Sequence, residues 1–118
     1  MTRKFASLIV VFLLTFSTHF AQQSAIYTND LVKFNRALEL YNNEQYLAAQ
    51  TLFDDVKDET NDEKIKSDAA YYIANAAVRL GQPGADQLMQ DFVDRYPTST
   101  KRNSAFLDVA DYYFETGK

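Results

Sequence analysis

The chain contains no cysteine and no tryptophan, and its only histidine is His19. The absence of cysteine excludes disulfide bonds, thiolate metal sites and cysteine nucleophiles. Histidine is the most frequent general acid–base residue, and a chain that lost residues 1–21 on export would keep none. We therefore expect no enzyme activity, no catalytic residue, no cofactor and no bound metal. Glycine and proline are also too scarce for a turn-rich all-β fold.

Basic residues are outnumbered by acidic ones, and the net charge is −4. Loss of residues 1–21 would remove Arg3 and Lys4 and no acidic residue, which leaves a net charge of −6. An acidic surface repels phosphate backbones, so we expect no nucleic-acid partner. The charged stretch from Asp54 to Lys64, which is mostly acidic, has no glycine, which a calcium-binding loop needs at its sharp turn. We interpret this run as a solvated helix end and linker.

The first 28 residues have the pattern of an export signal. Arg3 and Lys4 precede an apolar run over residues 5–16, which is shorter than the ~20 residues that a membrane-spanning helix needs. Small and polar residues then lead to Ala21. This order predicts a signal peptide over residues 1–21, a polar leader over 22–28, and export to the periplasm or outer membrane. An uncleaved signal anchor is the alternative, and the lack of cysteine excludes a direct lipid anchor.

Apolar residues in the remaining chain recur at helical spacing, and the whole pattern repeats after 36 residues. Positions that share a place in this repeat form columns. The first helix of each pair contributes Phe34, Ala70 and Phe106; Ala37, Ile73 and Val109; Leu38, Ala74 and Ala110; and Tyr41, Ala77 and Tyr113. The second helix contributes Ala49 and Ala85; Leu52 and Leu88; Phe53 and Met89; and Val56 and Phe92. Such a period is typical of stacked helical repeats.

The columns alternate small and large residues. Two helices that cross closely need a small residue at the crossing and a large one beside it. Alanines fill the first role, and the phenylalanines of neighbouring columns fill the second. One helical pair cannot bury both of its faces, so further pairs must stack on it. We therefore predict an all-α fold over residues 29–118, an α-solenoid of antiparallel helix pairs with about two and a half repeats.

The last repeat differs from the earlier ones. Phe106, Val109 and Tyr113 occupy columns that face a second helix in the earlier pairs, and Lys118 aligns with the start of that second helix. Solenoids usually finish with a unit that presents a polar outer face. We expect that the natural protein continues beyond Lys118. We also expect that the domain taken alone exposes an apolar patch and self-associates through its C-terminal helix.

The run Phe34-x-x-Ala37-Leu38-x-x-Tyr41, followed by Ala49 and Phe53, resembles the tetratricopeptide repeat family. The run Phe92-x-x-x-Tyr96-Pro97-x-Ser99 looks like the linker of bacterial envelope members of that family. These include outer-membrane-protein assembly lipoproteins and Tol-associated periplasmic coordinators. The resemblance implies a protein-binding scaffold of the cell envelope.

In that family the first helices of the pairs line a concave groove that holds an extended peptide or a helix. Carried over by column, the groove positions are Asn35, Glu39, Asn42, Tyr71, Asn75, Arg79, Leu107, Asp111 and Phe114. Asparagine both donates and accepts hydrogen bonds, so the three asparagines are the best candidates for binding a peptide backbone. The alternatives are a solvated helix face, a structural spacer, an accessory domain of an enzyme, and a membrane-tethered adaptor.

Overall fold

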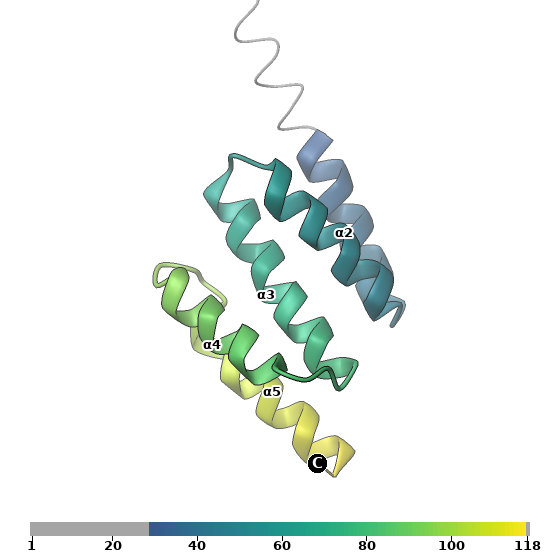
Figure 1. The fold of residues 1–118 in the computed structure, drawn as a ribbon, viewed down its shortest axis with the longest axis vertical. Coiled ribbons are helices and arrows are strands. Elements are labelled where there is room, and N and C mark those ends of the chain that lie inside the picture. The colour runs from purple at the N-terminus through teal and green to yellow at the C-terminus, as the bar shows by residue number, and fades with distance from the viewer. Residues whose placement is uncertain (1–28, 118) are drawn as a thin grey trace, which may run out of the picture.

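The computed structural model describes residues 29–117, and every regular element among them is a helix (Figure 1). The described part of the N-terminal helix covers residues 29–42. It is followed by α2 (Tyr46–Glu59), α3 (Glu63–Arg79), α4 (Ala85–Arg95) and α5 (Arg102–Thr116). The expected all-α class is confirmed. The predicted signal peptide over 1–21 and leader over 22–28 lie outside the described residues.

Helix α3 lies in the middle of the array, with α2 on one side and α4 and α5 on the other (Figure 1). Its sequence is apolar or small on most sides, as expected of a helix that is covered by several neighbours. One core cluster joins α3 to α2 and the N-terminal helix, and a second joins it to α4 and α5. Tyr72 of α3 packs against both clusters and so connects the two halves.

The alanine columns are buried where helices approach each other. Ala49 of α2, Ala74 of α3 and Ala85 of α4 are all in the core, as the small-residue columns predict. Ala110 of α5 shares a column with Ala74 but is exposed. The neighbouring Tyr113 is half-buried and donates its hydroxyl to Asp86 of α4 at 2.9 Å, but the described helices leave the Ala110 side chain exposed.

The apolar face of α4 is rotated from the expected one. The sequence predicts that Leu88 is buried with Met89 and Phe92, but Leu88 is 40% exposed and Val93 is buried in its place. At 100° per residue, the buried side of α4 is centred between Met89 and Phe92, and Leu88 lies about 90° away from that centre. The prediction for Leu88 is therefore wrong.

Two helices end in the same hydrogen-bonding motif with different residues. After α3, Gly81 (φ +64°) donates to the carbonyl of Val78 at 3.1 Å, and Gln82 donates to that of Ala77 at 3.0 Å. These two bonds define a Schellman motif, which needs a left-handed residue just after the helix. The N-terminal helix ends with the same pair of bonds, but Glu44 (φ +61°) occupies the left-handed position.

This difference predicts that Glu44→Gly stabilises the domain. A non-glycine residue in the left-handed conformation lowers the stability of the fold by about 1–2 kcal/mol. Replacement by glycine removes this strain, but it also increases the conformational entropy of the unfolded chain, which offsets part of the gain. We expect a net gain of about 0.5–1 kcal/mol, which raises the melting temperature by a few degrees in thermal denaturation. The matched change Gly81→Ala should lower the midpoint. A lower midpoint for Glu44→Gly would mean that the Glu44 side chain makes a stabilising contact that outweighs its backbone strain.

Candidate protein-binding surface

A chain of hydrogen bonds joins the N-terminal helix, α3 and α5. The Tyr41 hydroxyl of the N-terminal helix donates to Asn75 Oδ1 on α3 at 3.1 Å. Asn75 Nδ2 donates to the Tyr71 hydroxyl at 3.0 Å, and that hydroxyl donates to Asp108 of α5. Asn75 is only 2% exposed. Because a buried amide without partners would be costly, this network fixes the three helices relative to one another on one side.

Arg79 is placed at the edge of this network. Its Nε donates to Asn75 Oδ1 at 3.5 Å, and its guanidinium carbon lies 4.7 Å from the centre of the Tyr112 ring. The Tyr112 hydroxyl in turn donates to the backbone carbonyl of Arg79 at 3.1 Å. A planar cation stacked on an aromatic face is held in one orientation. Arg79 is half-buried, so this positioned charge still reaches solvent.

The network tyrosines stay protonated under physiological conditions. Burial raises the pKa of Tyr71, and the hydrogen bond to Asp108 raises that pKa further. Burial also raises the pKa of Tyr41. Both effects disfavour the phenolate, the first by desolvation and the second by the neighbouring negative charge. The two hydroxyls therefore remain donors, and the directions of the hydrogen bonds do not change with pH in the neutral range.

The nine groove positions predicted from the sequence fall into two groups. Tyr71 and Asn75 are buried in the network and Arg79 is half-buried, so these three form a floor. The other six are exposed: Asn35, Glu39, Asn42, Leu107, Asp111 and Phe114. Glu39 accepts a hydrogen bond from Arg36 at 2.6 Å, within the N-terminal helix. The buried Asn75 amide forms hydrogen bonds with Tyr41, Tyr71 and Arg79. It therefore supports the surface and does not itself face a bound peptide.

Sequence reasoning missed three residues that build this floor. Asp108 and Tyr112 complete the contacts between α3 and α5, and Lys101 Nζ lies 5.1 Å and 5.0 Å from the ring centres of Tyr71 and Tyr72. At a period of 36, Lys101 aligns with Ile65, so the columns do not identify it. The partners Tyr71 and Asp108 are 37 residues apart, so comparison of columns at a period of 36 does not pair them.

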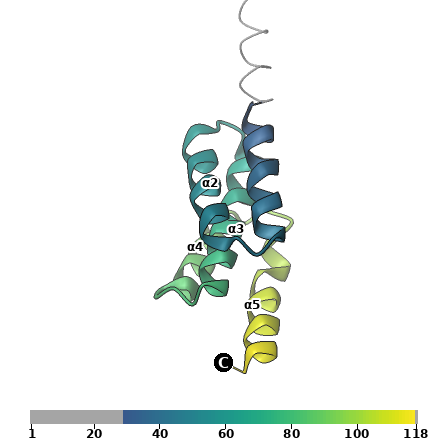
Figure 2. The ribbon, with the colours of Figure 1, turned by 90° about the vertical axis from the view of Figure 1, so that its right-hand side faces the viewer.

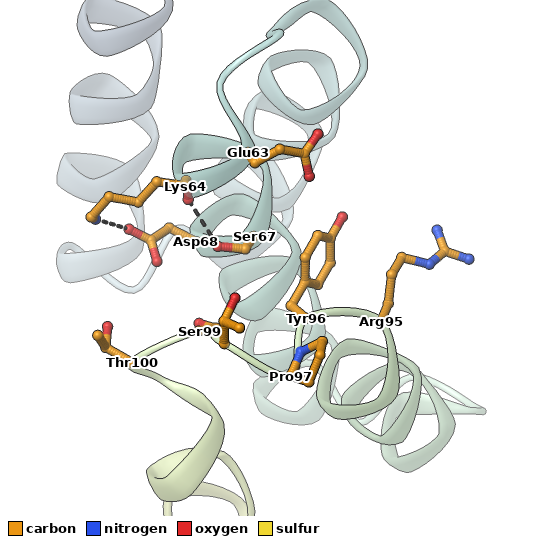
Figure 3. A pocket seen from close by; sticks show the side chains of 10 residues that line it. Glu63, Lys64, Ser67, Asp68, Arg95, Tyr96, Pro97, Ser99 and Thr100 are labelled. Carbon is orange, nitrogen blue, oxygen red and sulfur yellow. Dashed lines mark hydrogen bonds and ion pairs between the residues drawn. The ribbon is translucent and has the colours of Figure 1, made fainter.

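A separate hollow of about 480 Å³ lies between the start of α3 and the loop that follows α4 (Figure 3). Lys64 and Asp68 of α3 form an ion pair across 2.8 Å at its edge. The Ser67 hydroxyl donates to the Lys64 carbonyl at 3.0 Å, and Tyr96 and Pro97 form the opposite wall.

Residues 29–117 contain no candidate metal site and no candidate membrane span. No group of three or more His, Asp or Glu side chains in this range is placed to hold a metal ion. None of the helices in the same range has the length and apolarity that crossing a membrane requires. Comparisons of the chain with protein-family models, with curated proteins and with solved structures give no match.

Proposed function

We propose that residues 29–118 form a tetratricopeptide-like α-solenoid that works as a protein–protein interaction scaffold of the bacterial cell envelope. The 36-residue spacing of the alanine and aromatic columns supports the repeat architecture. The linker run from Phe92 to Ser99 and the signal-like pattern of residues 1–21 support the compartment. The partner is an extended peptide or a helix that lies along the first helices of the pairs.

The hydrogen-bond chain from Tyr41 through Asn75 and Tyr71 to Asp108 carries this proposal. It connects three helices from different pairs on one side of the molecule, and it holds their exposed side chains on a fixed floor. A prearranged surface loses little conformational entropy when a partner binds, so more of the contact energy appears as affinity. A spacer with no binding role would need only the apolar core.

The exposed residues indicate the chemistry of the partner. Asn35 and Asn42 offer both a donor and an acceptor to the backbone of a bound segment. Asp111 places negative charge at the α5 end of the surface, whereas Glu39 at the opposite end is paired with Arg36. Arg79 and Lys101 place positive charge over the floor between them. We therefore expect a partner segment with a carboxylate near its middle and a basic residue near its α5 end, because complementary charges set the register of binding.

Selection from a displayed library of random peptides, with the chain as target, tests this proposal. Binding of the selected peptides is then measured by calorimetry to the chain and to three variants. We expect Asn35→Ala and Arg79→Ala each to weaken binding by about tenfold, which corresponds to ~1.4 kcal/mol for a hydrogen bond to a partner. Asn61→Ala, an exposed change in the α2–α3 linker, is the matched control and should leave the affinity unchanged.

Failure to select any peptide above background would favour the structural spacer. Equal loss of binding in Asn61→Ala would show that the peptides bind elsewhere. The compartment is tested separately by intact-mass measurement after expression in a bacterium. The exported product should lack residues 1–21, whereas a soluble cytoplasmic pool that keeps Met1 would remove the envelope assignment.

A further inference from the structure

Helix α5 is apolar on two sides. Ala105 and Val109 are buried against the core. On another side, residues spaced by three and four form a strip, which we call the α5 stripe: Asn103, Phe106, Leu107, Ala110, Tyr113, Phe114 and Gly117. Tyr113 lies at the edge of this stripe, where it is half-buried and donates its hydroxyl to Asp86 of α4 at 2.9 Å. Phe106 is 48%, Leu107 65% and Phe114 89% exposed. Figure 2 shows α5 at the edge of the array, with its C-terminal half projecting away from the N-terminal helix and α2.

The α5 stripe carries no charged residue, although the chain is acidic. Each of the other described helices exposes at most one large apolar side chain, which is Val32, Leu47 or Leu88, whereas α5 exposes three. On α2 and α4 the exposed positions include Asp54, Asp55, Asp58, Gln87, Gln90, Asp91 and Asp94. A helix with apolar residues on two sides is typical of a helix that is covered on both. The contrast indicates that something covers the α5 stripe.

The residues of the stripe are spaced symmetrically about Ala110, so their spacing is the same in both chain directions. Ala110 is at the centre, with Leu107 and Tyr113 three residues away on either side and Phe106 and Phe114 four residues away. In an antiparallel pair of α5 helices centred on Ala110, Phe106 of each copy lies opposite Phe114 of the other. The small side chain at the centre allows the two backbones to approach closely. We propose that the α5 stripe binds the same stripe of a second copy, antiparallel, around a two-fold axis at Ala110.

The available area indicates a weak dimer. A phenylalanine buries about 150–250 Å² when it is fully covered, so the exposed fractions of Phe106 and Phe114 supply roughly 250–300 Å² together. With Leu107 added, one copy contributes about half of the ~800 Å² per partner that is usual for stable complexes. The dimer should therefore form at micromolar or higher concentration and dissociate on dilution.

A charged residue beside the stripe makes the strength of the proposed dimer depend on salt. Asp111 is exposed and follows Ala110 directly. In an antiparallel pair the same flanking position of both helices meets on one side, which brings the two Asp111 carboxylates near each other. Like charges within about 10 Å repel and are screened by salt. We expect the dimer to strengthen with added salt and in Asp111→Asn.

The absence of cysteine from the chain allows a direct test of the pairing. Three single-cysteine variants of the full chain are oxidised under mild conditions at about 100 μM, a concentration at which a micromolar dimer is populated. Ala110→Cys places the two thiols at the crossing. Asn103→Cys lies on the same stripe, but an antiparallel pair separates its two copies by about 20 Å along the helices, too far for a disulfide. Ala48→Cys is an exposed site on α2 and reports random collisions.

We expect Ala110→Cys to form a covalent dimer at least tenfold faster than the other two variants, and faster still when combined with Asp111→Asn. Equal rates at Ala110 and Asn103, a faster rate at Asn103, or no excess at Ala110 over Ala48 would overturn the proposal. The stripe shares Leu107 and Phe114 with the proposed peptide surface, so a dimer would cover the α5 end of that surface. The rate of disulfide formation reports on contacts of α5 alone, and it does not depend on whether a peptide binds.

Discussion

Ala74→Glu is expected to abolish the cooperative unfolding transition of the domain. Ala74 is 1% exposed, and it belongs to the core cluster between α3 and α4. A carboxylate at this position would lose its hydration without gaining a partner, and its bulk would push the helices apart. Either effect costs several kcal/mol, and a domain of this size has about 5–15 kcal/mol of stability in total. Circular dichroism during thermal denaturation measures the loss.

The chain offers a matched control for Ala74→Glu. Ala110 has the same place 36 residues later, but it is exposed. Ala110→Glu adds the same side chain to the same column and should keep the helical signal and a cooperative melt. If Ala74→Glu melts at the same temperature as the unmodified chain, then α3 and α4 do not approach each other at Ala74, and the register of the columns is wrong.

Phe53→Ala is expected to lower the free energy of unfolding by about 3–5 kcal/mol. Phe53 is 0% exposed, and its ring stacks on Tyr72 with a centre-to-centre distance of 5.0 Å. Phe34 meets it edge-on at 5.3 Å. Alanine would leave a cavity and remove both ring contacts at the place where α2, α3 and the N-terminal helix meet. Urea denaturation gives the change from the shift in midpoint at constant slope.

Two controls separate the cavity from a general effect of losing an aromatic ring. Phe53→Leu keeps most of the volume and should cost much less, about 1.5 kcal/mol or below. Phe106→Ala removes a half-exposed ring from α5 and should cost under about 1 kcal/mol at protein concentrations too low for dimers. Equal losses at Phe53 and Phe106 would contradict the burial difference between the two ends of the domain.

The sequence predicts the helical class and much of the core because both follow from spacing. Ala49, Ala74 and Phe53 are identified as buried by their columns, and the structure buries all three. Spacing is less informative about boundaries. Helix α3 begins at Glu63, inside the run interpreted as a linker, because the Asp62 side chain accepts a hydrogen bond from the Ile65 amide at 2.9 Å and caps the helix. That capping pattern was hidden within a run of acidic residues.

Other errors arise where tertiary contacts override a local pattern. Leu88 has helical spacing with Met89 and Phe92, but neighbouring helices cover α4 only over a limited arc. Glu44 takes a backbone conformation that favours glycine, because the motif that ends the N-terminal helix requires it. Neither outcome can be read from periodicity, because each depends on where a neighbouring element lies.

Spacing predicted which residues lie on the N-terminal helix, α3 and α5, but not which of them face solvent. Columns place Asn75 among residues on the first helices, and they cannot distinguish a polar side chain that faces solvent from one that faces a neighbouring helix. The structure puts Asn75 between Tyr41 and Tyr71. The exposed polar positions, such as Asn35 and Asn42, are the ones that remain available to a partner.

Mapping of a bound peptide by amide chemical shifts tests the central claim most directly. A peptide selected on the chain is titrated into isotope-labelled protein, and shifts are assigned to helices. Our account predicts that the largest shifts fall on the N-terminal helix, α3 and α5, around Asn35, Glu39 and Arg79. Shifts that fall instead on the outward faces of α2 and α4, around Asp54 and Asp91, would contradict it.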